Sequence, residues 1–224
     1  MKPLSPVVFL QNLRIMIIKL LFEGRHDNHY LEQGGYYIFP LYSSSTFAVG
    51  EKVVLVDTGD ISKKDLLIKK LKEEGLQPKD VDFVIITHFH LDHTSNVHLF
   101  PNSQIIAFNA IRFPDGRARI FRKFPENYIP EISILETPGH TLDSISVLIN
   151  KDTICAGDAI RADHLRREKI PKYRSGEKYL ASMKKIFNTK GLKRIIPGHG
   201  PVIEGDELVR LKNRVNSLSA DDFF

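Results

Sequence analysis

Four short apolar segments of this chain each end at a turn that is followed by histidine or aspartate. The segment VDFVIIT runs into HFHLDH at residues 88–93, ISILETPG runs into His140, DTICAG into Asp158, and KRIIPG into His199. Loops at the strand ends of one sheet edge bring side chains together without distorting the core. The recurrence therefore predicts a strand-rich fold in which these side chains converge at one edge.

The HFHLDH segment concentrates four metal-binding side chains directly after an apolar strand. In extended or turning backbone, His88 and His90 point the same way, whereas a helical HExxH pair requires spacing i and i+4. Asp92 and His93 fall where the chain turns into a helix, so they can face a second ion. One segment can thus contribute ligands to two metal ions.

Composition limits the classes of protein to which the chain can belong. The 224 residues are 42% apolar and 26% charged, which suits one globular domain over residues 1–224 and excludes disordered, fibrous and membrane-spanning classes. The apolar stretch 13–22 contains Arg14 and Lys19, so it is expected to be a strand and not a signal peptide or membrane span. The single cysteine, Cys155, excludes an internal disulfide and a Cys-rich zinc site, suits a core position and favours a cytoplasmic location.

The hydrophobic pattern alternates between strands and helices. One helix is expected from Ser62, as its cap, to about Glu74, and a second over 177–188. The polar stretch 24–35 is expected to be a connection between two strand runs, with His26 and His29 in a solvent-facing turn. Many short strands with interspersed helices indicate a layered α/β architecture.

Two long connections, 109–131 and 160–175, are rich in arginine and lysine. Loops of this length often form lids or rims of a site, although isolated surface charges usually contribute little. The formal charge of +5 can favour phosphates or acidic substrates but is small for a dedicated nucleic-acid binder.

With these motifs in place, the chain resembles the metallo-β-lactamase superfamily, from the DTG at Asp57 to the PGHG at His199. The resemblance implies a four-layer αββα sandwich with a metal site along one edge of two facing sheets. By position, the first metal would be bound by His88, His90 and His140, the second by Asp92, His93 and His199, and Asp158 would bridge both. Asp57 would support the ligands without binding metal, although a simple Asx-turn role is equally compatible with the sequence.

The ligand set predicts the reaction chemistry. Two divalent ions can share a water molecule, generate a bridging hydroxide at neutral pH and polarise the scissile bond. Zinc is the expected metal, with iron and manganese left open, and Asp92 and Asp158 are the expected catalytic carboxylates. The expectation is a hydrolase of a small ester, thioester or lactone.

The chain differs from better-known members of this superfamily, and these differences limit the subgroups that it can resemble. Beta-lactamases of the main subclass have a cysteine where this chain has Asp158, which instead resembles glyoxalase II, lactonases and RNA-processing nucleases. Only 40 residues separate Asp158 from His199 and 25 follow His199, too few for the large extra domains of β-CASP nucleases or typical glyoxalase II. A short single-domain form is expected.

Three alternatives remain open. A mononuclear iron sulfur dioxygenase would use His88, His140 and Asp158; a phosphodiesterase or nuclease would use the basic loops; and a non-enzymatic binding module would tolerate loss of His90. A small-molecule substrate is favoured over nucleic acid, with His164 and Tyr173 as possible pocket residues. No membrane partner is expected, and the oligomeric state is left open.

Overall fold

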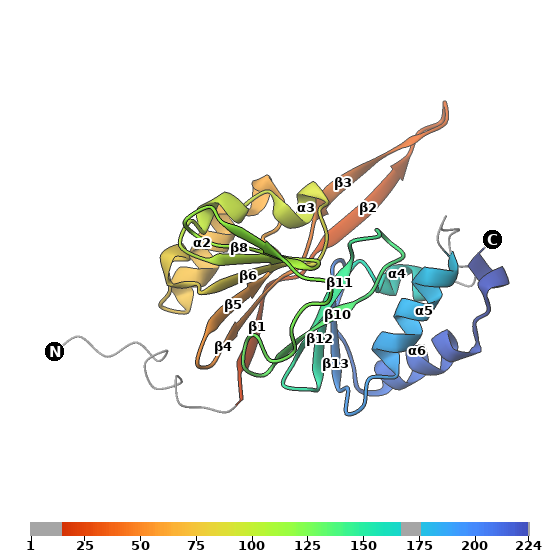
Figure 1. The fold of residues 1–224 in the computed structure, drawn as a ribbon. Coiled ribbons are helices and arrows are strands. Elements are labelled where there is room, and N and C mark those ends of the chain that lie inside the picture. Colours follow the sequence, from red (N-terminus) through yellow and green to blue (C-terminus); the bar gives the residue numbers. More distant parts are fainter. Residues whose placement is uncertain (1–14, 167–175, 224) are drawn as a thin grey trace.

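The computed structural model describes residues 15–166 and 176–223, and in this part of the chain the strands form two large sheets and a two-stranded ribbon. In the order of pairing, the first sheet comprises β1 (Ile17–Phe22), β4 (Ser45–Val49), β5 (Val53–Val56), β6 (Phe83–Ile86), β7 (Gln104–Ala107), β8 (Ala110–Arg112) and β9 (Ala118–Ile120). The second comprises β10 (Ile132–Glu136), β11 (Ile145–Ile149), β12 (Thr153–Gly157), β13 (Arg194–Pro197) and β14 (Ile203–Glu204). The ribbon pairs β2 (Arg25–Tyr30) with β3 (Tyr36–Tyr42) and projects from the body of the molecule (Figure 1).

The helices cover the outer faces of the two sheets. They are α2 (Lys64–Glu73), α3 (Leu91–Thr94), α4 (Ala162–Leu165), α5 (Gly176–Phe187) and α6 (Gly205–Ser217), with 3-10 turns η1 (Ile61–Lys63), η2 (Pro78–Asp80), η3 (Val97–Leu99) and η4 (Ala220–Phe223). In the described part of the chain, none of them combines the length and apolarity needed to cross a bilayer.

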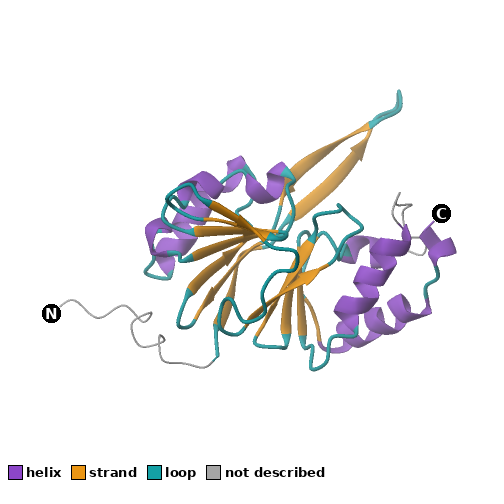
Figure 2. Cartoon of the chain, viewed as in Figure 1, coloured by secondary structure: helices purple, strands orange, loops and turns teal. Residues whose placement is uncertain are grey.

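Three apolar clusters define four layers. One joins α2, through Leu67 and Leu71, to the first sheet. The second lies between the two sheets, and the third joins the second sheet to α5 and α6. The order helix, sheet, sheet, helix confirms the predicted αββα sandwich, visible in Figure 2.

Strand β5 shows why both faces of the sheet are covered. Its four consecutive residues are all buried. Val53 and Leu55 belong to the cluster under α2, whereas Val54 and Val56 belong to the cluster between the sheets. Because successive side chains of a strand point to opposite faces, an uninterrupted apolar run is what a two-sided sheet requires.

The predicted helices are present with shifted starting points. Ser62 does not cap the first one: it lies in the 3-10 turn η1, which Asp60 caps by accepting a hydrogen bond from the Ser62 amide at 2.8 Å, and α2 begins after Lys63 without a side-chain cap. The second, α5, ends at Phe187, next to the predicted boundary. Element ends are the least certain part of a pattern-based prediction.

Two expected connections contain strands. The stretch 24–35 contains β2, so the prediction that His26 and His29 lie in a polar turn is wrong. The stretch 109–131 contains β8 and β9, which extend the first sheet. Strand β2 has polar residues on both faces because it belongs to a ribbon that only its partner strand covers along much of its length.

The two sheets are linked by backbone hydrogen bonds at the end where the predicted ligands lie. The amide of Ile145, at the start of β11, donates to the carbonyl of Thr87, after β6, at 2.8 Å. The amide of Ser44 donates to the carbonyl of Gly198 at 2.7 Å. These bonds fix the strand ends of one sheet relative to those of the other.

Candidate metal centre

The turn after β6 presents the HFHLDH segment to one end of the sandwich. His90 has extended backbone (φ −69°, ψ 145°) and caps the short helix α3. His88 Nε2 lies 3.1 Å from His90 Nδ1, so the two rings converge as their i, i+2 spacing predicts. The helical turn that follows places Asp92 and His93 in buried positions facing inward.

The remaining three predicted ligands come from the second sheet. His140 lies in the turn between β10 and β11, and its Nε2 is 3.1 Å from His90 Nδ1. Asp158 follows β12, with Oδ2 3.4 Å from His140 Nε2 and Oδ1 3.4 Å from both His93 Nε2 and His199 Nε2. His199 follows β13 and lies 3.2 Å from Asp92 Oδ2.

These seven side chains form adjoining groups, each with ligand atoms within 4.8 Å of one another: His88, His90 and His140; His88, His93 and Asp158; and Asp92, His93 and His199. Asp158 lies between the first and the last group, as the distances to His140 and His199 show. The structure thus brings together every residue that was predicted to bind metal.

Gly198 allows this close approach. A Cβ atom at this position would lie 2.2 Å from Asp158 Oδ1 and 3.0 Å from His93 Cε1. A side chain here would therefore displace the carboxylate from the middle of the cluster. Close packing against Asp158, and not only the turn, therefore requires glycine before His199.

Asp57 orients His93 from behind. The Asp57 carboxylate accepts hydrogen bonds from the Thr87 amide at 2.8 Å and from the Thr87 hydroxyl at 2.7 Å. Its Oδ2 is also 2.8 Å from His93 Nδ1. A carboxylate beside Nδ1 holds a proton on that nitrogen, so Nε2 is the atom of His93 that would face a metal ion in the cluster.

Several inward-facing atoms lack the hydrogen-bond partners that buried polar atoms normally have. Among the described residues, His93 Nε2, Asp158 Oδ1 and His199 Nε2 are fully buried without one. Such atoms are costly to bury unless a ligand or water satisfies them. Imidazole nitrogens and carboxylate oxygens converging in this way fit the ligand preference of zinc and similar divalent cations.

The ionisation of the cluster also favours a cation. Burial, reinforced by the charge of His93, lowers the pKa of His88 to about 2, so its ring is neutral and able to bind metal. Burial opposes a charge on His93, but the Asp57 and Asp158 carboxylates outweigh it and raise the pKa of His93 to about 10. Burial likewise opposes ionisation of Asp158, yet His199, His93 and His140 hold its pKa well below the usual range. The buried carboxylates thus stabilise a positive charge next to them. A metal ion can supply that charge in place of a proton on His93.

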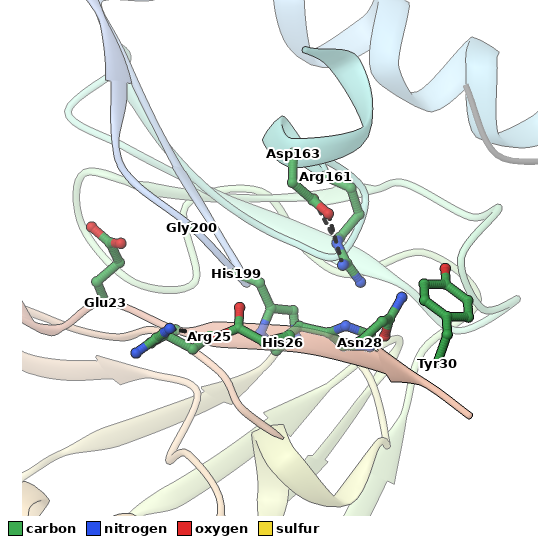
Figure 3. A pocket seen from close by; sticks show the side chains of 11 residues that line it. Glu23, Arg25, His26, Asn28, Tyr30, Arg161, Asp163, His199 and Gly200 are labelled. Atoms are coloured by element: carbon green, nitrogen blue, oxygen red, sulfur yellow. Dashed lines mark hydrogen bonds and ion pairs between the residues drawn. The ribbon is translucent and has the colours of Figure 1, made fainter. Parts of the chain in front are cut away.

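Next to His199 lies a cavity of about 610 Å³, between β2 and the segment that begins α4 (Figure 3). His26, Asn28, Tyr30, Arg161 and Asp163 are among its lining residues. The His26 ring meets the His199 ring edge to face, with centroids 5.3 Å apart. His26 is half-buried beside the cluster and not in a solvent-facing turn, which corrects the sequence-based prediction.

Two residues, His164 and Tyr173, were predicted as possible substrate contacts, and the structure describes only the first of them. His164 lies in α4 with Nε2 3.4 Å from Asp163 Oδ2, and in the described part of the chain it is not among the residues lining this cavity. Tyr173 lies outside the described residues.

Sequence reasoning missed the contribution of β2 and Arg161. Arg161 is buried, with Nη1 3.8 Å from Asp158 Oδ2 and Nε 3.2 Å from Asp163 Oδ1. Its position three residues after Asp158 was a usable signal, because the segment following a metal ligand stays near the site. No comparable signal identifies His26, which is distant in sequence from every ligand.

Comparisons with known proteins agree with this geometry. Residues 38–107 match the family model of the metallo-beta-lactamase superfamily. A probable metallo-hydrolase of Methanocaldococcus jannaschii is 36% identical over 158 residues, covering 70% of this chain and 75% of that protein. Metallo-beta-lactamase domain-containing protein 1 of Xenopus laevis is 30% identical over 207 residues, covering 85% of this chain and 88% of that protein.

A solved structure shares the fold. The crystal structure of a putative metallo-beta-lactamase from Thermotoga maritima superposes with a TM-score of 0.60 at 18% identity, covering 85% of this chain and all of that one. The chain therefore belongs to the metallo-hydrolases of the metallo-beta-lactamase superfamily.

Proposed function

We propose that the protein is a dinuclear metal-dependent hydrolase that cleaves a small ester, thioester or lactone, with residues 1–224 acting as one catalytic unit. The observation that carries the proposal is the position of Asp158. Its two oxygens lie 3.4 Å from His140 on one side and 3.4 Å from His199 on the other. One carboxylate between two groups of ligands can help to hold two cations next to each other.

The residues have distinct parts in this proposal. His88, His90 and His140 would hold one ion and Asp92, His93 and His199 the other, and Asp158, whose oxygens lie near both groups, would contribute to both. Two divalent ions bound here would lower the pKa of water and polarise the carbonyl oxygen of the substrate. Asp57 keeps the His93 ring in one orientation, while Asp92 and Asp158 are the proposed catalytic carboxylates, which would act by holding the ions in place.

Zinc is the metal proposed, because imidazole and carboxylate ligands suit it, as they also suit iron and manganese. The buried free thiol of Cys155 is in keeping with the cytoplasmic location that we propose.

The cavity supports a small-molecule substrate in preference to nucleic acid. Its volume of about 610 Å³ falls within the usual range for small-ligand sites. Its lining includes the acidic residues Glu23, Asp27 and Asp163 beside Arg25 and Arg161. Such a lining lacks the excess of positively charged side chains with which proteins bind the phosphate backbone of nucleic acids.

The test is the metal content of the purified protein, combined with turnover of ester, thioester, lactone and phosphodiester substrates. We expect two zinc ions per chain and hydrolysis of a carbonyl substrate that Asp158→Ala abolishes. Asp115→Ala removes an exposed acid that is not among the described residues lining the cavity, so it serves as the matched control and should keep full activity.

Other outcomes would contradict the proposal. One iron per chain with oxygen consumption would indicate an oxygenase. Cleavage of phosphodiesters alone, with binding that weakens steeply with salt, would indicate a nuclease. Activity that survives Asp158→Ala at the full rate would belong to another site.

A further inference from the structure

The two proposed ion sites differ in how deeply their ligands are buried. The first site comprises His88, His90 and His140, and the second comprises Asp92, His93 and His199. All three ligands of the second site are buried, whereas in the first site His90 is exposed and His140 is partly exposed. Exposed side chains on turns are held by fewer packing neighbours than buried ones. The affinity of the first site for an ion therefore depends on what fixes the turns that carry His90 and His140.

The two sites also differ in the contacts that orient their histidine rings. In the second site, Asp57 lies 2.8 Å from Nδ1 of His93. The His90 ring has polar contacts, within the described part of the chain, only with His88 and His140, which are ligands of its own site. The orientation of the His90 ring is therefore set by the backbone of its turn.

Asp143 connects the turn of His90 with the turn of His140. Its Oδ2 accepts a hydrogen bond from the Phe89 amide at 3.2 Å. Phe89 lies between His88 and His90, and Asp143 follows shortly after His140. Asp143 itself is in none of the groups of described residues that could hold a metal ion. It therefore acts on the backbone that carries the ligands and not on an ion.

This hydrogen bond continues a pairing of the two chain segments. The Ile145 amide donates to the Thr87 carbonyl at 2.8 Å. Phe89 and Asp143 stand at the i+2 and i−2 positions from that pair, and the Asp143 side chain supplies the acceptor there. Hydrogen-bonded pairs of antiparallel segments recur at this spacing. Asp143 therefore extends the contact between the two segments from Thr87 to the residue directly before His90.

We propose that Asp143 is a positioning residue, which holds the His90 turn against the His140 turn and thereby sets the affinity of the first site for its ion. The second site, whose ligands are buried and include His93 held by Asp57, does not depend on it. This inference rests on the proposed dinuclear function and adds a residue that controls one of the two sites.

The experiment measures zinc binding at each site separately. Zinc is titrated, in competition with a chelator, into the metal-free full-length protein labelled with ¹⁵N in its histidine rings. The NMR signals of the His140 ring report on the first site, and those of the His199 ring report on the second. In Asp143→Ala we expect the zinc affinity of the first site to fall about tenfold, which corresponds to one hydrogen bond. The affinity of the second site should stay the same.

Two further variants separate the hydrogen bond from other effects. In Asp143→Asn the side-chain oxygen can still accept from the Phe89 amide although the charge is lost, so the wild-type affinity should be kept. An equal loss in the asparagine and alanine variants would mean that the carboxylate attracts the ion by its charge, and would overturn the positioning role. Leu142→Ala is the matched control, because Leu142 is exposed on the same turn, and it should bind zinc like the wild type. A tenfold loss there would also contradict the inference.

A second measurement needs no metal. Hydrogen exchange of the Phe89 amide, followed by NMR in the metal-free protein, should be slow in the wild type and in Asp143→Asn and faster in Asp143→Ala. Fewer than two zinc ions in the wild type would refute the dinuclear function, and the exchange rates would then still decide whether Asp143 holds the turn. Equal exchange rates in the wild type and Asp143→Ala, or an unchanged affinity of the first site, would overturn the inference.

Discussion

At the scale of single residues, Asp57 contacts a predicted metal ligand, His93, without itself belonging to the predicted ligand set. Its backbone has φ 55°, a conformation that few residues other than glycine, asparagine and aspartate adopt readily. This turn lets the carboxylate reach Thr87 and His93 together. The sequence left open whether Asp57 was a turn residue or a support for the ligands, and the structure shows that the turn conformation is what allows the contact with His93.

Replacing Asp57 with asparagine should weaken metal binding. Asparagine tolerates the positive φ, so the change causes little backbone strain. It removes the negative charge of the carboxylate next to His93 Nδ1. We expect the affinity for zinc to fall about 10- to 100-fold, as is usual when a residue that orients a histidine ligand is lost. Competition with a chromophoric chelator measures it. Asp60→Asn is the control, since asparagine can still cap η1, and equal affinities of the two variants would contradict the role assigned to Asp57.

Cys155 should be unreactive in the folded protein. It is buried between the sheets, and burial raises the pKa of its thiol to about 12. Because the thiolate is the reactive form, alkylation by iodoacetamide at mildly alkaline pH should be negligible until the protein is unfolded in guanidinium. Mass spectrometry of both samples checks this. Stoichiometric labelling of the native protein would show that the core around β12 opens readily.

At the scale of elements, α5 holds the turns that carry two of the ligands. The Tyr179 hydroxyl donates to the Asp158 carbonyl at 3.0 Å, and the Ser182 hydroxyl donates to the Pro138 carbonyl at 2.6 Å. Gly139, before His140, packs against the same helix: a Cβ there would lie 2.4 Å from Tyr179 Cα. The helix therefore sets how far His140 stands from the rest of the cluster.

Gly139→Ala should separate α5 from this turn. Gly139 has φ 143°, so alanine brings backbone strain as well as a clash with backbone atoms. We expect a loss of about 2–4 kcal/mol in the free energy of unfolding and weaker metal binding. Chemical denaturation and chelator competition measure the two effects. Gly116→Ala, with φ 90° but nothing within 4 Å of the added Cβ, should lose about 1 kcal/mol and keep its metal. A similar loss in both variants would mean that the clash with α5 is unimportant.

Many of the predicted elements have buried apolar faces. β5, β6, β12 and β13 are continuous apolar runs, and the apolar face of α5 is likewise visible in the sequence. β2 was missed because its residues RHDNHY have no apolar face. α6 was also missed, although Leu208, Leu211 and Val215 have helical spacing and are buried in the structure.

At the scale of the whole molecule, the predicted metal ligands come from both sheets. Four of them follow β6 of the first sheet, whereas His140, Asp158 and His199 follow strands of the second. Ions bound between them would connect the two halves of the sandwich at an end where the apolar cluster between the sheets gives way to polar residues. Metal binding should therefore be coupled to the stability of the whole fold.

Removal of metal should lower the thermal stability of the whole protein in one step. A ligand present at about 1,000 times its Kd contributes about 4 kcal/mol, which in a chain of this size corresponds to a fall in Tm of roughly 10 °C on chelation. Calorimetry with EDTA, followed by zinc, measures the loss and its recovery. The Tm of Asp158→Ala should respond far less to EDTA. An identical response of the variant and the wild type would show that the stabilising metal binds elsewhere.

The sequence by itself indicated the side chains that converge at the predicted metal site, the strands that precede them and the layered architecture, because local spacing, apolar pattern and the motifs of the family carry these signals. The tertiary structure decided which groups surround the ligands: the position of Asp57 behind His93, of α5 against the turn of His140, and of β2 alongside His199. These contacts join residues far apart in the chain, and their side chains carry no periodic signal. Their positions follow from how the two sheets and the ribbon pack together.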